Sequence, residues 1–64
     1  PNPAKDIIQF REAVNHVEIY NMSGQLILDK QKVGNELDIS SLPVGNYLIT
    51  INQEALSSQP LIKQ

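Results

Sequence analysis

One stretch decides the fold: His16-Val17-Glu18-Ile19-Tyr20-Asn21-Met22-Ser23-Gly24-Gln25-Leu26-Ile27-Leu28-Asp29-Lys30. Its first part alternates between polar and apolar side chains, as a strand with one buried face does. Gly24 then allows a tight connection, because glycine takes a positive φ without steric cost. The return over residues 25–30 alternates again, with Leu26 and Leu28 opposed to Ile27 and its polar neighbours. These features predict a β-hairpin.

Short runs of β-forming residues recur along the rest of the chain, each closed by turn residues. The run at residues 47–51 has the clearest pattern, since Tyr47, Ile49 and Ile51 share one face. Residues 11–15 are too few to predict a helix, and β-like runs lie on both sides of them. We therefore expect six short strands, at residues 6–10, 16–21, 25–30, 36–39, 47–51 and 61–63.

Two prolines shape the connections between these runs. Pro43 has no N–H donor and drives Leu42 towards extended backbone, so we expect Leu42 to tuck under an edge of the sheet. Pro60 confines the last strand to a sheet edge, or itself to the first residue of that strand. Residues 53–58 are predicted to form a polar turn. Six short strands at this spacing predict an all-β sandwich or small barrel.

The composition sets limits on size and partners. The 64 residues make a single domain over residues 1–64, with 41% apolar residues, no Trp and no Cys. A chain this short buries only about 60% of its unfolded surface, and without cysteine it has neither disulfides nor thiolate metal sites. The net charge of −2, spread without a basic patch, argues against nucleic acid. No apolar run approaches the roughly 20 residues of a membrane span. Because the sequence begins at Pro1 without a signal peptide, we expect a fragment of a longer protein.

The residues that could carry catalysis or bind a metal form no recognisable motif. His16 is the only histidine and has no nucleophile-elbow serine, so we interpret it as a polar residue at the start of a strand. Asp29, Glu36 and Asp38 lack the spacing of a calcium loop, and we expect Glu36 and Asp38 to face solvent. The three glycines lie in separate turns, which does not suit a phosphate-binding loop. We therefore predict no catalytic, cofactor-binding or metal-binding residues.

Four motifs, each weak alone, follow one another in a distinctive order and spacing. They are Pro1-Asn2-Pro3-Ala4-Lys5-Asp6, Val17-Glu18-Ile19-Tyr20-Asn21-Met22-Ser23-Gly24-Gln25-Leu26, Leu37-Asp38-Ile39-Ser40-Ser41-Leu42-Pro43-Val44-Gly45-Asn46-Tyr47-Leu48-Ile49 and Leu61-Ile62-Lys63-Gln64. In this order the sequence resembles the type A C-terminal sorting domain of cargo proteins of the type IX secretion system (Por secretion system) in Bacteroidetes-type bacteria. The resemblance covers essentially the whole chain.

The resemblance implies a small immunoglobulin-like antiparallel β-sandwich of about six to seven short strands, at the C-terminus of a larger secreted protein. The parent cargo protein upstream of Pro1 would enter the periplasm by a signal peptide. This domain would then direct it through the outer-membrane translocon. A sortase-like protease would normally remove the domain, leaving the parent attached to the cell surface or released. The resemblance implies no enzyme activity and no cofactor for the domain itself.

The same resemblance points to particular residues. As the recognised sorting signal it implies Gly45, Tyr47, Leu61, Ile62 and Lys63. As fold determinants it implies Pro1, Asn2, Pro3 and Gly24. A final strand at a sheet edge would present its backbone for strand addition by a receptor. The same edge would allow the isolated domain to form a homodimer.

An alternative function is an accessory immunoglobulin-like module that binds carbohydrate or protein beside a parent enzyme. This hypothesis predicts exposed aromatic side chains clustered on one face, and only Tyr20 and Phe10 are available to form such a cluster. The residue inventory leaves an independent enzyme without candidates for its chemistry.

Overall fold

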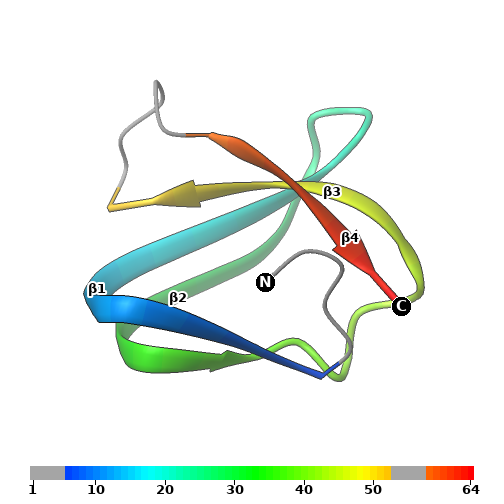
Figure 1. Cartoon of the computed structure of the whole chain (residues 1–64). Helices are drawn as coiled ribbons and strands as arrows, with labels where there is room; N and C mark the ends of the chain where they lie inside the picture. Colours follow the sequence, from blue (N-terminus) through cyan, green and yellow to red (C-terminus); the bar gives the residue numbers. More distant parts are fainter. Residues whose placement is uncertain (1–5, 53–57) are drawn as a thin grey trace.

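The computed structural model describes residues 6–52 and 58–64, which form β-strands joined by turns and contain no helix. All four strands belong to one antiparallel sheet in the order β2-β1-β3-β4 (Figure 1). The strands are β1 (Ile7–Asn21), β2 (Leu26–Asp38), β3 (Gly45–Ile51) and β4 (Gln59–Lys63). The all-β class is confirmed, whereas the described residues give one sheet of four strands where six to seven strands in a sandwich were expected.

The difference in strand number has a simple origin. The runs predicted at residues 6–10 and 16–21 fall at the two ends of β1, and those predicted at 25–30 and 36–39 fall at the two ends of β2; only residues 6, 25 and 39 lie just outside the strands. Residues 11–15, where the sequence pattern is interrupted, continue β1 instead of ending it. At these residues the backbone of β1 stays extended, but its pairing with β2 is irregular because the register shifts.

Bulges bend this long hairpin. Gln9 pairs with Glu36 and Val14 with Gly34, so β1 advances five residues while β2 advances two. One further residue is then added on β2, beside Lys32 with φ 54°. Such insertions bend a strand and increase its twist. Figure 1 shows β1 and β2 as a curved hairpin whose first half has left the line of β3.

The hydrophobic core lies inside this bend. Its members come from all four strands and from the connection after β2: Ile8, Val14, Val17, Ile19, Leu37, Ile39, Leu42, Tyr47, Ile49 and Leu61. The burial of Leu42 confirms its predicted place under the sheet. Because the two halves of the bent hairpin both contribute, one sheet supplies the opposing walls that a thin core needs.

The β1–β2 turn confirms the predicted hairpin. Gly24 N–H donates to the Asn21 carbonyl (3.0 Å) and Asn21 N–H to the Gln25 carbonyl (2.9 Å). The Asn21 side chain accepts from the N–H groups of Ser23 and Gln25, at 2.9 Å each. Gly24 takes φ 86°, a conformation that side-chain-bearing residues adopt only at a cost. Glycine thus occupies the position of this turn at which the backbone takes a positive φ.

The sequence pattern places Leu26 and Leu28 on the same face of the sheet, and this prediction is wrong for Leu26. The pairing shifts by one residue between Ile19 and Tyr20, so Leu28 lies opposite Ile19 and Leu26 opposite Tyr20. Leu28 packs against the core, as expected, but Leu26 is 46% exposed on the outer face. A bulge changes which face the residues beyond it occupy, and alternation alone does not reveal it.

The connection after β2 is held by a carboxylate. Asp38 Oδ1 accepts a hydrogen bond from Ser40 N–H at 2.8 Å, and Leu42 N–H donates to the Ile39 carbonyl at 3.0 Å. The hydrogen bonds to Ser40 are the main cause that lowers the pKa of the Asp38 carboxyl. Glu36 and Asp38 are both exposed, as predicted, and Asp38 serves this turn.

We expect Gly24→Ala to reduce the free energy of unfolding by about 1–2 kcal/mol, the usual cost of a left-handed backbone for a residue with a Cβ. No atom lies within 4 Å of the added Cβ, so the cost is purely conformational. Urea unfolding measures it, with Ser23→Ala as the control because only the Ser23 backbone takes part in the turn. An equal loss in both variants would contradict this explanation.

We expect Asp38→Asn to destabilise the domain at neutral pH and to make little difference in strong acid. The folded-state pKa is lowered from its ordinary value of 3.8. The stabilisation by the charged form is therefore present above that value and is lost as pH falls through the lowered pKa. Thermal unfolding from pH 7 to pH 2 measures the effect. Glu36→Gln is the control, since no hydrogen bond joins its side chain to a described residue, and a pH-independent difference for Asp38→Asn would argue against the mechanism.

Candidate functional site

The five residues predicted for the sorting signal come together on neighbouring strands. In the β3–β4 ladder Gly45 lies opposite Lys63, Asn46 opposite Ile62, and Tyr47 opposite Leu61. The predicted residues are thus two short segments, distant in sequence, that meet at one end of the sheet. We refer to residues 45–47 and 61–63 as the sorting ladder. Pro1, Asn2 and Pro3, predicted as fold determinants, lie outside the described residues.

The sorting ladder has an inner and an outer face. Tyr47, Leu61 and Lys63 are only 3–6% exposed, and they point towards the core. Ile62, between two buried neighbours, is 41% exposed on the outer face. A protein that contacts the folded domain at this place therefore meets Ile62, whereas Tyr47, Leu61 and Lys63 are buried.

Tyr47 joins the ladder to the preceding turn. Its hydroxyl donates a hydrogen bond of 2.5 Å to the carbonyl of Pro43, four residues upstream. A Cβ added at Gly45 would lie 3.9 Å from this hydroxyl, an ordinary contact. The tyrosine thus fixes the Pro43 turn, on which Leu42 depends, to the start of β3. At the other end of the ladder, the Lys63 ammonium donates to the Gln64 carbonyl at 3.1 Å.

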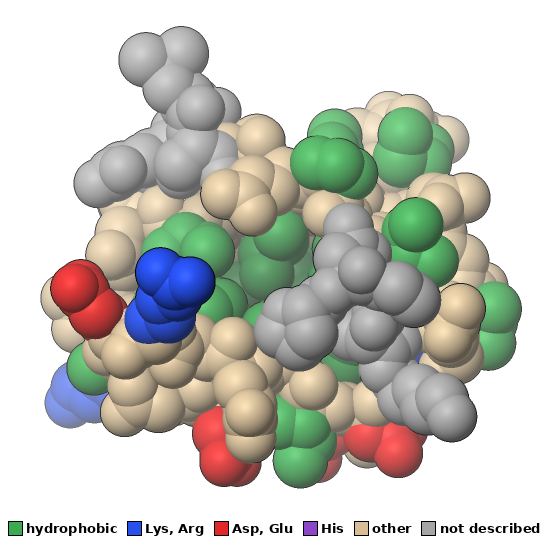
Figure 2. Space-filling view, viewed as in Figure 1, with side chains coloured by type: hydrophobic (Ala, Val, Ile, Leu, Met, Phe, Trp, Pro, Cys, Tyr) green, Lys and Arg blue, Asp and Glu red, His purple; other side chains and the backbone are tan. Residues whose placement is uncertain are grey.

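An apolar row crosses the outer face of the sheet beside the ladder. Leu26, Tyr20, Leu48 and Pro60 lie opposite one another on β2, β1, β3 and β4, and Ile62 follows two residues after Pro60. Leu48 is 37% exposed, and Leu26 and Ile62 more so. We call these five residues the outer row. Figure 2 shows hydrophobic side chains gathered over the β1–β2 turn and β3. The solvent face of an antiparallel sheet is ordinarily polar, so a continuous row of this kind marks a candidate contact surface.

The outer row ends at a cluster of ionisable side chains on β1 and β2. His16 Nε2 lies 2.5 Å from Asp29 Oδ1, and Glu18 lies directly opposite Asp29. Ligand-type atoms of all three residues lie within 4.8 Å of one another. His16 and Asp29 bond directly to each other, which makes the cluster a paired polar network. Partial desolvation, followed by the charge of Glu18 and a hydrogen bond to it, raises the pKa of Tyr20.

Sequence reasoning did not identify the outer row or this cluster. His16 lies well inside β1, and its side chain is mostly buried, so its interpretation as a polar residue at a strand start is wrong. The spacing of His16, Glu18 and Tyr20 places them on one face of a strand. Their partners Asp29, Leu26 and Leu48 could be assigned only with the register, which depends on the bulges.

The two aromatic side chains of the alternative hypothesis do not share a surface. Phe10 packs against the core, in the first half of β1. Tyr20 lies in the outer row on the opposite face. The described residues therefore offer no aromatic platform of the kind that carbohydrate binding by stacking requires.

We expect Tyr47→Phe to reduce the free energy of unfolding by about 1 kcal/mol, the typical net contribution of one hydrogen bond. The ring is kept, so the packing of the core does not change. Tyr20→Phe is the matched control, and it should change stability by less than about 0.5 kcal/mol because the Tyr20 hydroxyl and its partner Glu18 meet on the outer face of the sheet. Equal stability of Tyr47→Phe and the unsubstituted domain in urea would show that the bond to Pro43 contributes nothing.

Among the described residues, no helix has the length and apolar character needed to cross a membrane. Comparisons with curated proteins and with solved structures give no significant match. The sequence does match a protein family over residues 1–64, and the family is described as "Secretion system C-terminal sorting domain". The match spans the whole chain, including all four motifs. The chain therefore belongs to the family of C-terminal sorting domains of type IX secretion.

Proposed function

We propose that this domain is the C-terminal sorting signal of a larger cargo protein, and that it directs the cargo through the outer membrane by way of the type IX translocon. The family match over residues 1–64 carries this proposal. The structure is compatible with it, since the domain is small and the described part contains no membrane-spanning helix. In this role the domain needs to fold and to be recognised, and it performs no chemistry of its own.

Recognition is proposed to involve the sorting ladder and the outer row together. Gly45, Tyr47, Leu61 and Lys63 would set the position of β4 from inside the fold, and Ile62 would be the part of the ladder that a receptor touches. The burial of Tyr47, Leu61 and Lys63 and the exposure of Ile62 support this division. The outer row continues the same surface across the sheet, so the receptor would meet an apolar strip instead of a single side chain. Gly24 would act as a fold determinant through its turn.

The finer features of the fold belong to this proposal as well. We propose that the bent sheet is a compact form of the immunoglobulin-like sandwich, with the two halves of the β1–β2 hairpin in the positions of two layers. The bond from the Tyr47 hydroxyl to a carbonyl four residues upstream supports this, because immunoglobulin domains have a tyrosine corner of the same kind.

The later steps are proposed from the family alone. A sortase-like protease would remove the domain by cleavage at a site upstream of it, and the parent would end attached to the cell surface or released outside the cell. A homodimer through an edge strand is proposed for the isolated domain, since β4 is the last strand in the sheet order. The alternative function, an accessory binding module, has no observation in its favour beyond the outer row.

Export of a fluorescent reporter tests the proposal. The reporter carries a signal peptide and residues 1–64, and is expressed in a host with a working type IX system and in its translocon mutant. We expect reporter outside the cell or on its surface only in the working host. Reporter that is folded but retained in the periplasm of both strains would overturn the proposed function.

One substitution pair then separates recognition from folding. Ile62→Ser is expected to reduce the exported fraction several-fold, because it makes the exposed centre of the sorting ladder polar. Ile7→Ser is the control, since Ile7 is similarly exposed (45%) but lies in β1, which does not pair with β4. Thermal unfolding of both purified variants checks that each is folded. Equal export of the two variants would contradict the role of Ile62.

A further inference from the structure

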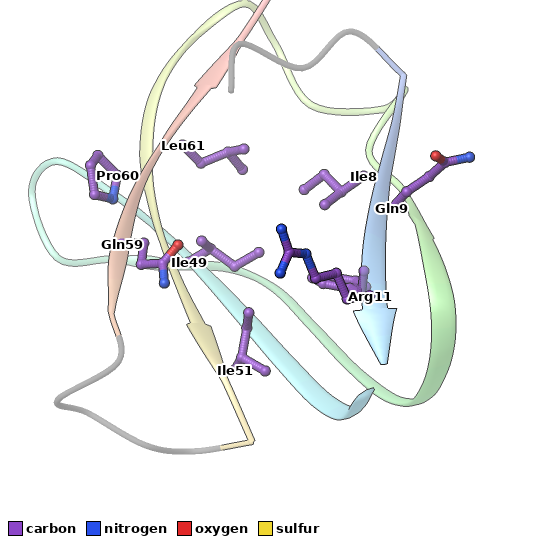
Figure 3. Close-up of a pocket in the computed structure, with 9 residues that line it drawn as sticks. Ile8, Gln9, Arg11, Ile49, Ile51, Gln59, Pro60 and Leu61 are labelled. Carbon is purple, nitrogen blue, oxygen red and sulfur yellow. The ribbon is translucent and has the colours of Figure 1, made fainter. Parts of the chain in front are cut away.

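A groove opens where the first half of β1 leaves the line of β3. Its volume is about 590 Å³, within the range of sites that bind small ligands or peptide side chains. Ile8 on one side faces Ile49, Ile51 and Leu61 on the other, while Gln9 points away (Figure 3). The facing side chains are aliphatic, so the groove suits apolar groups of similar size.

One cation lies in these apolar surroundings. Arg11 lines the groove, and its guanidinium points into it from β1 (Figure 3). The only ion pair among the described residues joins His16 and Asp29, so Arg11 has no acidic partner there. The Arg11 side chain is exposed at the groove, and a guanidinium offers a planar set of donors that matches a carboxylate. The groove therefore combines aliphatic contacts with one site for an anionic group.

The backbone beside the groove is also available. Ile39 N–H donates a hydrogen bond of 2.7 Å to the Asp6 carbonyl, so the carbonyl of Asp6 faces the β2 side, where Ile39 directly follows the end of β2. Because backbone groups alternate along a strand, those of Ile8 face β2 while those of Ile7 and Gln9 face the other side. On that side β3 pairs with β1 only from Val17 onwards. Among the described residues, no strand pairs with this edge at Ile7 or Gln9.

We propose that this groove binds an extended peptide segment of a partner protein that carries aliphatic side chains and a carboxylate. The peptide pairs with the free edge of β1 at Ile7 and Gln9, a form of β-strand addition. Its aliphatic side chains enter between Ile8 and Ile49, and its Asp, Glu or C-terminal carboxylate pairs with Arg11. The charge of Arg11 selects an acidic segment, and the free strand edge selects a peptide over other anionic amphiphiles. The groove shares the inward-facing Leu61 with the sorting ladder but lies on the opposite side of the sheet from Ile62, and it does not depend on the proposed export function.

Titration of the isotope-labelled chain with two synthetic peptides tests the proposal. The first probe is acetyl-Thr-Val-Thr-Ile-Thr-Asp-amide, and the second has Asn in place of Asp, so that only the first carries a carboxylate. We expect the first to shift the amide signals of the groove residues and to slow hydrogen exchange at Gln9 N–H. Exchange at Ile8 N–H, already directed to β2, should change little. The Asn peptide should bind about tenfold more weakly, as expected for the loss of one charge-assisted contact.

Substitutions assign the carboxylate contact. Arg11→Gln should weaken binding of the acidic peptide about tenfold and leave binding of the Asn peptide nearly unchanged, which is the signature of a direct pair. Lys30→Gln, the removal of another exposed cation on β2, should have no such effect. Unfolding curves confirm that both variants are folded.

Three outcomes would overturn the proposal. The first is the absence of shifts at the groove residues with millimolar acidic peptide. The second is equal weakening by Arg11→Gln and Lys30→Gln, which would indicate a general charge effect. The third is binding of laurate in the groove without binding of either peptide, which would assign the site to an anionic amphiphile.

Discussion

The additional residues in β1, between its pairing with Glu36 and its pairing with Gly34, bend the whole sheet. The core depends on this bend. A flat sheet of four strands would leave both of its faces in contact with solvent. A chain of 64 residues has little else with which to cover either face. With the bend, Ile8 and Leu37 come to face Ile49 and Leu61. The groove beside Arg11 has the same origin, because it lies where the bent half of β1 parts from β3.

The bend also separates the two faces of the β3–β4 ladder. The inner face is committed to the core through Tyr47 and Leu61, and the Tyr47 hydroxyl fixes the preceding turn. The outer face keeps Leu48 and Ile62 accessible in a row that continues onto β1 and β2. We propose that the domain has to fold and to be recognised, and that these two tasks fall on opposite faces of the same two strands. Under the proposed function, the residues that matter for export include some that are buried in the folded domain.

Much of this could be predicted from local patterns. Alternation identified β3, the turn residues Asn21 and Gly24 identified the hairpin, and Pro43 placed Leu42 correctly in the core. The order of four motifs identified the family. The strand number could not be predicted, since extended residues across a bulge look like a loop between two strands. The outer row was missed for a related reason: the register that sets Leu26 and Leu48 beside Tyr20 is a property of the ladder and not of any one segment.

The central claim is that the type IX machinery contacts the outer face of β3–β4 in the folded domain. Site-specific photo-crosslinking in living cells tests it most directly. A photo-reactive amino acid replaces Ile62 in one reporter and the exposed Glu36, on β2, in another, in a host with a working type IX system. The account predicts a crosslink from position 62 to an outer-membrane component of that system, and none to it from position 36. Equal crosslinking from both positions, or crosslinking from position 36 alone, would contradict it.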